Sequence, residues 1–272
     1  MKKKKVTLIL LLIFFLGLFI LLYPMISQYW NSRVSSYAVT NYEEAIHKIS
    51  TEEYNEMRNA ANLYNMELRK LNYPLAQYKR LKNYNDLLNV NNNGMMGYIS
   101  IPKIKVEIPI YHGTSASVLN TAVGHLEGSS LPVGGIGTHS ALSAHRGLPS
   151  SKLFTDLNKL EIGDEFTITI LDQVLTYQVD QIEVVKPSEI KNLTIDADAD
   201  YVTLLTCTPY GINTHRLLVR GKRIEASTEK QLFINNEAYL IDKLVVAFII
   251  SLIIILISMI YISLKPIKKR KY

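Results

Sequence analysis

Cysteine is almost absent from this sequence, with Cys207 as its single occurrence in 272 residues. One cysteine cannot form a disulfide within the chain, and a structural zinc site built on several cysteines is excluded. No histidine pair has the helical i, i+4 spacing with nearby carboxylates that a metal site uses, so we expect no metal and no cofactor. Cys207 is then a free thiol, an intermolecular link or a small buried hydrophobic side chain.

Charge of either sign is missing from two long stretches. No charged residue occurs between Lys5 and Arg33, and residues 244–264 form a second uncharged run, LVVAFIISLIIILISMIYISL. Each stretch is long enough to cross a bilayer, which takes about 20 apolar residues in a helix. Lys and Arg cluster at residues 2–5 and again at residues 265–271. Because such clusters mark cytoplasmic flanks, we expect two membrane spans, with residues 33–240 on the extracellular face of the cell membrane.

The first stretch has an alternative interpretation as a cleaved signal peptide. The apolar core of a signal peptide has roughly 7 to 15 residues, and this stretch is longer. No small-residue cleavage site follows it in YPMISQYWNS. We therefore expect a retained membrane anchor.

The net charge of +6 is not spread evenly over the chain. Nine of the 30 Lys and Arg lie in the two terminal clusters, which leaves 21 basic side chains against 24 acidic ones. Nucleic-acid-binding domains concentrate basic residues on their folded surface. We therefore expect no nucleic-acid partner.

Glycine is absent from residues 35–90, and Pro74 is the only proline there. Apolar residues recur in this segment at steps of three and four, which predicts one or two amphipathic helices that pack on another part of the protein. The alternative is a coiled-coil spacer that holds the next domain off the membrane. The periodic residues are Ala45, Ile46, Ile49, Tyr54, Met57, Ala60, Ala61 and Tyr64.

After the turn-rich NVNNNG at residues 89–94, the sequence changes to short alternating segments. This pattern is typical of an all-β barrel or sandwich. Short helical pieces are expected at residues 115–123 and 152–160. The expected strands are residues 97–101, 105–111, 137–145, 165–171, 175–185, 201–207 and 215–223.

Cys207 ends one of these strands, and the turn-forming loop TPYGINT leads to the next. If the two strands pair as a hairpin, Arg216 becomes a neighbour of Cys207. A guanidinium beside the sulfur favours the thiolate over the thiol and can hold a developing oxyanion. The alternative for Arg216 is a solvated surface side chain.

A thiolate nucleophile also needs a group that returns a proton to the leaving amine. Six histidines are present, and His145 has the same strand-to-loop placement as Cys207, because it enters the turn RGLP. His139 and His215 rank only slightly behind His145 by position. The residues alone leave the choice of histidine open.

At these residues the chain resembles a class C, pilus-assembling sortase of Gram-positive bacteria. The resemblance rests on TLLTCTPYGINTHRLLVRGKR (203–223), SAHRGLPSSKLFTDL (143–157), MGYISIPKIKVEIPIYHGT (96–114) and HLEGSSLPVGG (125–135). It implies a mainly β fold: an eight-stranded sortase β-barrel with short helices, preceded by an N-terminal helical segment and flanked by the two membrane helices.

The resemblance also implies a site and a reaction. Cys207 is the nucleophile, His145 the general acid and base, and Arg216 the cation that orients the substrate and faces the oxyanion. The reaction is transpeptidation, in which an LPxTG-like sorting signal is cleaved between Thr and Gly and joined to a lysine amine of a pilin subunit. Three alternatives stay open: a sortase that attaches proteins to cell-wall peptide, a membrane-bound cysteine protease that uses water, and a non-catalytic extracellular scaffold.

Class C sortases usually carry a lid anchored by an Asp-Pro-aromatic tripeptide, and this sequence lacks that tripeptide. Pro74 follows Tyr73 instead of an aspartate. We expect residues 71–84 to form a lid that covers the groove loosely through Tyr73, Leu75 or Tyr78, or that stands open. The alternative is a plain connector.

The expected organisation has six parts along the chain. They are a basic tail and first span (1–32), an extracellular helical segment with the candidate lid (33–94), the catalytic barrel (95–226), a linker (227–243), the second span (244–264) and a basic cytoplasmic tail (265–272).

Overall fold

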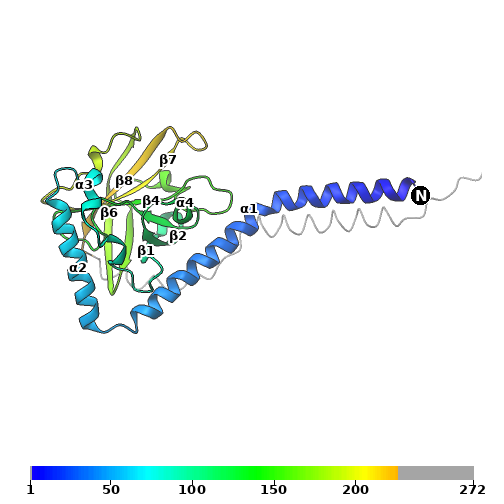
Figure 1. Cartoon of the computed structure of the whole chain (residues 1–272). Helices are drawn as coiled ribbons and strands as arrows, with labels where there is room; N and C mark the ends of the chain where they lie inside the picture. The colour runs from blue at the N-terminus through cyan, green and yellow to red at the C-terminus, as the bar shows by residue number, and fades with distance from the viewer. Residues whose placement is uncertain (1, 226–272) are drawn as a thin grey trace, which may run out of the picture. The chain divides into compact units, whose positions relative to one another are not determined.

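The computed structural model describes residues 2–225, which comprise a long N-terminal helix, a second helix and a β-barrel (Figure 1). In this range the helices are α1 (Lys2–Ile46), α2 (Thr51–Arg69), α3 (Pro74–Gln77) and α4 (Ala116–Leu119), with 3₁₀ turns η1 (Tyr78–Arg80), η2 (Tyr84–Asp86), η3 (Pro102–Ile104), η4 (Leu157–Lys159) and η5 (Lys191–Leu193). The strands are β1 (Met95–Ile101), β2 (Val106–His112), β3 (Val123–His125), β4 (Thr138–Ser143), β5 (Glu165–Ile170), β6 (Gln173–Val185), β7 (Asp200–Thr208) and β8 (His215–Ile224).

The eight strands close into a barrel in the order β1-β2-β3-β4-β7-β8-β6-β5. Neighbouring strands are antiparallel except for the pairs β2–β3 and β4–β7, which are parallel. The predicted eight-stranded barrel is confirmed, and all seven expected strands are present. The short strand β3 is the eighth and is not among the expected ones, because the sequence predicts a helix over residues 115–123, whereas the helix ends at Leu119.

Side chains alternate between the barrel interior and the outside along its strands. In β5, Phe166, Ile168 and Ile170 are buried, whereas the residues between them are partly exposed. Phe166 stacks on Tyr177 of β6 with ring centroids 5.7 Å apart. Gly221 of β8 lies against the Phe166 ring and the Cβ of Tyr177, where any side chain would collide with them. The alternating sequence pattern therefore builds a continuous apolar interior.

The C-terminal part of α1 is attached to the barrel through a buried hydroxyl. Tyr42 Oη donates to the carbonyl of Met96, at 2.8 Å, and accepts from the backbone N–H of Leu171, at 2.9 Å. These partners belong to β1 and to the turn between β5 and β6. The hydroxyl thus connects three segments that are distant in sequence.

Helix α2 lies beside the barrel and packs one face on it (Figure 1). Its first turn is capped by Ser50, whose hydroxyl accepts from the N–H of Glu53 while the Glu53 carboxylate accepts from the N–H of Ser50. The amide side chain of Asn65 pairs with both backbone groups of Leu131. The prediction of amphipathic packing helices is therefore confirmed, and the alternative of a coiled-coil spacer is wrong. The buried residues of α2 are Ala61, Tyr64, Asn65 and Leu68.

Two expected helical regions differ from the structure. The helical segment predicted to reach residue 90 ends at Arg69, and residues 70–94 form turns around α3, η1 and η2. Residues 152–160 form turns and η4 instead of an α-helix. Both regions are anchored by contacts with distant parts of the chain, which local helix propensity does not report.

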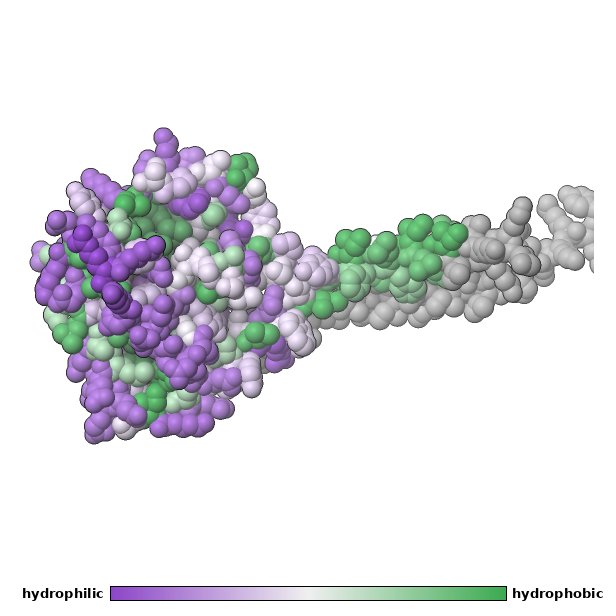
Figure 2. Space-filling view, in the orientation of Figure 1, coloured by the Kyte–Doolittle hydropathy of each residue, from purple (hydrophilic) through white to green (hydrophobic). Residues whose placement is uncertain are grey.

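The first predicted span coincides with a helix. From Ile9 onward, α1 is long and apolar enough to cross a membrane, by length and composition. Figure 2 shows hydrophobic surface on the N-terminal part of α1, whereas the visible face of the barrel is mostly hydrophilic. The second predicted span at 244–264 lies outside the described residues, as do the linker at 227–243 and the tail at 265–272.

Candidate active site

Cys207 and Arg216 are direct neighbours across the β7–β8 hairpin. The register pairs Cys207 with Arg216 and Thr208 with His215, which confirms the neighbourhood expected from the sequence. Paired residues of adjacent strands project from the same face of a sheet. Cys207 is a half-buried free thiol. The Arg216 guanidinium donates to the carbonyls of Asn213, at 3.1 Å, and His215, at 3.0 Å, so the hairpin loop holds its Nη1.

His145 follows the end of β4, the strand on the other side of β7. The register pairs Ser143 with Leu205, and the pairing extends one residue further, because Ala144 N–H donates to Leu205 O at 3.1 Å. Since the strands are parallel, two more residues along each bring the chain to His145 and Cys207. This register places His145 level with Cys207 and Arg216, in the order His145, Cys207, Arg216 across three adjacent strand ends.

The backbone around His145 is held from both sides. The hydroxyl of Thr206 donates to Ala144 O at 2.7 Å, and Phe154 N–H donates to His145 O at 3.2 Å. His145 itself is half-buried. His145 is therefore level with Cys207 along the strands, and half-burial leaves part of its side chain exposed.

His139 and His215, the other histidines near these strands, have different surroundings. His139 is buried, with Nδ1 at 2.9 Å from Thr194 O and Nε2 at 2.8 Å from the hydroxyl of Thr203. Burial lowers the pKa of His139, so it is a neutral residue of the barrel wall. His215 hydrogen-bonds the adjacent Thr214 and pairs with Thr208, one residue beyond the thiol.

Arg146, which reasoning from the sequence missed, bonds three groups beside the site. Its guanidinium donates to Thr155 O, to the hydroxyl of Thr208 and to Oδ1 of Asn158. All three partners are neutral, so they do not cancel its charge. Its position directly after His145 is the signal that could have drawn attention to it. The guanidinium of Arg146 therefore bonds the residue that directly follows Cys207 on β7.

The segment at 71–84 packs against the loop between β3 and β4. The backbone of Pro74 and Leu75 lies so close to Gly128 that a side chain there would collide with it. The hydroxyl of Tyr78 hydrogen-bonds the Glu127 carboxylate, which raises the pKa of this tyrosine. Tyr73 is 70% exposed, and Leu75 and Tyr78 are half-buried. The lid role of these three residues stays a prediction.

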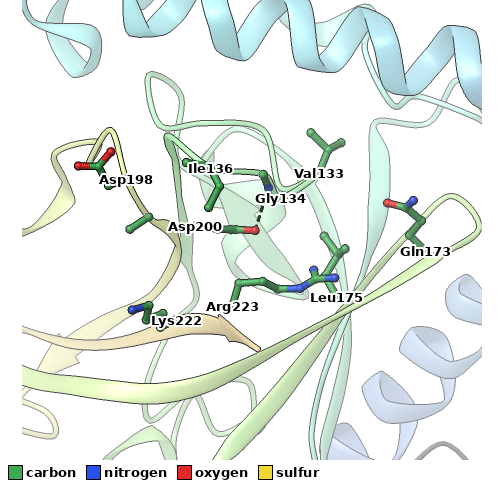
Figure 3. Close-up of a pocket in the computed structure, with 11 residues that line it drawn as sticks. Val133, Gly134, Ile136, Gln173, Leu175, Asp198, Asp200, Lys222 and Arg223 are labelled. Carbon is green, nitrogen blue, oxygen red and sulfur yellow. Dashed lines mark hydrogen bonds between the residues drawn. The ribbon is translucent and has the colours of Figure 1, made fainter. Parts of the chain in front are cut away.

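A cavity, drawn in Figure 3, lies at the opposite end of β7 from Cys207. It has a volume of about 420 Å³ and is lined by the start of β7 and the end of β8. Asp200 there accepts hydrogen bonds from Gly135 N–H, Tyr177 and Thr138. Seven residues of extended strand separate Asp200 from Cys207, which is roughly 23 Å. The cavity is therefore separate from the thiol.

The fold is a closed eight-stranded barrel, and a histidine, a cysteine and an arginine lie level with one another at the ends of three adjacent strands. This combination defines a class of β-barrel cysteine enzymes. A sortase domain is matched over residues 99–224. The chain belongs to the sortase family, whose members are transpeptidases with a cysteine active site.

Solved structures resemble this chain over most of its length. Sortase C1 from Streptococcus agalactiae is 50% identical, with a TM-score of 0.66, and the match covers 70% of this chain and 99% of that one. Sortase C from Streptococcus pneumoniae is 42% identical, with a TM-score of 0.61, over 70% and 97% of the two chains. Sortase C from Clostridium perfringens SM101 is 45% identical, with a TM-score of 0.59, over 70% and 99%.

Sortase D of Bacillus subtilis is a more distant relative. It is 30% identical over 131 residues, which are 47% of this chain and 63% of sortase D. The chain thus matches less than two thirds of the length of this curated relative. The stronger likeness is to the sortases C.

Proposed function

We propose that this protein is a pilus-assembling cysteine transpeptidase with Cys207, His145 and Arg216 as its catalytic residues. The proposal rests on the strand register, which brings these three residues level with one another at adjacent strand ends, in a chain 50% identical to a sortase C. Sortase C from Streptococcus pneumoniae has specificity for pilin substrates. A Clostridium perfringens sortase C structure contains a C-terminal cell-wall sorting motif.

The proposed reaction has two steps. The Cys207 thiolate attacks the threonine carbonyl of an LPxTG-like signal, the Thr–Gly bond breaks, and imidazolium at His145 gives its proton to the leaving glycine amine. The product is a thioacyl-enzyme. A lysine amine of a second pilin then attacks the thioester, His145 takes its proton, and the thiolate leaves as an isopeptide bond forms. Arg216 stabilises the oxyanion in both steps.

The partners and the location follow from the same proposal. Pilin proteins supply the sorting signal and the acceptor lysine, and the bilayer holds the apolar part of α1. We place residues 95–226 on the extracellular face as the catalytic domain, with residues 71–84 as its lid and residues 244–264 as a second span. Cysteine-accessibility labelling of sites introduced near residues 33 and 240, in intact cells, tests this topology. Protection of either site from an impermeant reagent would contradict it.

Trapping the acyl-enzyme tests the reaction. Full-length protein in detergent is mixed with sorting-signal peptides, and the mass of the adduct on Cys207 is determined. Supplying a lysine amine should convert the adduct to a ligated product, whereas a protease would release only the hydrolysed acid. A cell-wall-attaching sortase would prefer a cell-wall peptide amine over the pilin lysine.

Mutation of the three residues provides the genetic test. Cys207→Ala, His145→Ala and Arg216→Ala should each abolish polymer formation without unfolding the barrel, because none of the three is fully buried. His139→Ala should retain more activity, because His139 lies in the barrel wall. Retained polymerisation in any of the three variants at normal expression would overturn the assignment of that residue.

A further inference from the structure

The guanidinium of Arg146 is the link between the loop that carries His145 and the strand that carries Cys207. Its Nε donates to Thr155 O at 3.2 Å, its Nη1 to the hydroxyl of Thr208 at 3.2 Å, and its Nη2 to Asn158 Oδ1 at 2.8 Å. Thr208 directly follows Cys207, and Arg146 directly follows His145. One side chain therefore connects the segments directly after the two residues that act on the same substrate bond in the proposed reaction.

Two hydrogen bonds within the loop after His145 join its beginning to its end. Gly147 N–H donates to the hydroxyl of Thr155 at 3.0 Å, and Phe154 N–H donates to His145 O at 3.2 Å. These bonds set the local shape of the loop. Before His145, Ala144 is bonded to β7 through Leu205 and Thr206. After His145, Arg146 adds a side-chain connection to β7, because it holds both Thr155 in the loop and Thr208 on the strand.

A second contact reinforces this connection from the hairpin loop. Gly147 has a φ of +80°, and a Cβ built on it would lie 2.7 Å from the ring of Tyr210. The Tyr210 ring thus covers the turn after Arg146, although 60% of the tyrosine is exposed. The β7–β8 loop and the His145 loop are therefore in direct contact at this point.

We propose that Arg146 is a positioning residue that sets the place of the His145 imidazole relative to the Cys207 sulfur. This inference rests on the proposed transpeptidase function. Arginine suits the task because its planar guanidinium presents several donors in fixed directions. A lysine has the same charge, but its three N–H donors leave from one nitrogen, so they do not reproduce the three separate positions from which the guanidinium bonds the loop backbone, Asn158 and Thr208.

The test is a kinetic comparison in the full-length protein in detergent. The probe is a synthetic peptide containing Leu-Pro-Glu-Thr-Gly, with Nα-acetyl-lysine amide as the acceptor. Since displacements near 1 Å at a reacting centre cost about 100-fold in rate, Arg146→Met should lower kcat by about 10- to 100-fold. KM should change little, because a proton-transfer residue acts in the transition state. Arg146→Lys should also be impaired, by at least about fivefold, if the donor arrangement matters more than the charge.

Thr208 provides the matched partner for this experiment. Thr208→Val removes the hydroxyl at nearly constant volume and should lower kcat, whereas Thr208→Ser keeps the hydroxyl and should restore most of it. The double variant with Arg146→Met should be no slower than Arg146→Met alone, because the two residues then act through one bond. Asn158→Ala, which leaves the bond to Thr208 intact, should reduce kcat less than about threefold.

The pH profile separates positioning from simple loss of stability. A His145 that no longer sits beside the sulfur stabilises the thiolate less, so the acidic limb of the kcat/KM profile should move to higher pH in Arg146→Met. Wild-type kcat in Arg146→Met, wild-type behaviour in Arg146→Lys, or fully additive effects with Thr208→Val would each overturn the inference. Failure of the proposed function itself gives a different result, in which the wild-type protein forms no product with the probe.

Discussion

Gly128 is one point at which the segment at 71–84 touches the β3–β4 loop. One added methyl group there tests whether this segment covers Cys207. A Cβ on Gly128 would lie 2.8 Å from Leu75 Cα and 3.0 Å from Pro74 O. Because these are backbone atoms, no side-chain rotation relieves the overlap. In Gly128→Ala, the segment must move away from the loop.

Gly128→Ala has two separate energetic consequences, backbone strain at residue 128 and steric overlap with the segment at 71–84. Gly128 has a φ of +88°, and an alanine in this left-handed region costs about 1 to 2 kcal/mol whether or not the segment is in place. The overlap with Leu75 adds strain that opening of the lid relieves. If this relief is about 1 kcal/mol, the population of open lid rises about fivefold. A lid held by a few contacts is sensitive to a change of this size.

The assay is the rate at which a small methanethiosulfonate reagent modifies Cys207 in the full-length protein in detergent. Gly163→Ala is the matched control, because Gly163 has a φ of +96° and no atom lies within 4 Å of its added Cβ. It carries the same backbone strain without the contact to the lid. Labelling about fivefold faster in Gly128→Ala alone would support the lid. Equal rates in Gly128→Ala and Gly163→Ala would refute the reasoning and leave the segment a connector.

Two further predictions concern stability. Tyr42→Phe should lower the free energy of unfolding by about 2 to 4 kcal/mol, because it leaves two buried backbone groups without a partner. The control is Tyr98→Phe, which should lower it by less than about 1 kcal/mol, because the Tyr98 hydroxyl bonds an exposed carboxylate. Urea denaturation measures both variants, and equal losses would contradict the argument. Burial lowers the pKa of His125 from 6.5 to about 4, so the unfolded chain binds more protons in that window, and stability falls as the pH drops. The loss from this histidine should be about 2 kcal/mol at pH 5 relative to pH 7.5, and an unchanged pH dependence in His125→Gln would show that the loss comes from other groups.

The strands were predictable wherever alternation continued over enough residues. β5 alternates over all 6 of its residues, and in β6 the apolar Leu175, Tyr177 and Val179 alternate with polar residues, so their sequences alone predict them. β3 has only three residues, too few to show a period. It becomes a strand because β2 and β4 supply partners on both sides. Such a strand depends on contacts between distant segments, which a local pattern does not contain.

The candidate site also contains some contacts that the sequence predicts and others that it does not. Cys207 and Arg216 were predictable as neighbours, because a short loop joins two strands and hairpin pairing follows from it. The interactions of Arg146 were not predictable, because its partners stand 9, 12 and 62 positions away in the sequence. Only the folded barrel brings the ends of β4 and β7 together. The residues that hold a catalytic group in place are thus harder to find from sequence than the group itself.

The hydrogen bonds of Tyr42 have a consequence for the order in which the chain folds during its synthesis. Its partner Leu171 lies 129 residues further along the sequence. Ribosomes add about 5 to 20 residues per second, so Leu171 is synthesised roughly 6 to 26 seconds after Tyr42. On α2, Asn65 bonds Leu131, which lies 66 residues further along the sequence. Both of the first helices therefore complete their docking only after a large part of the barrel has been synthesised.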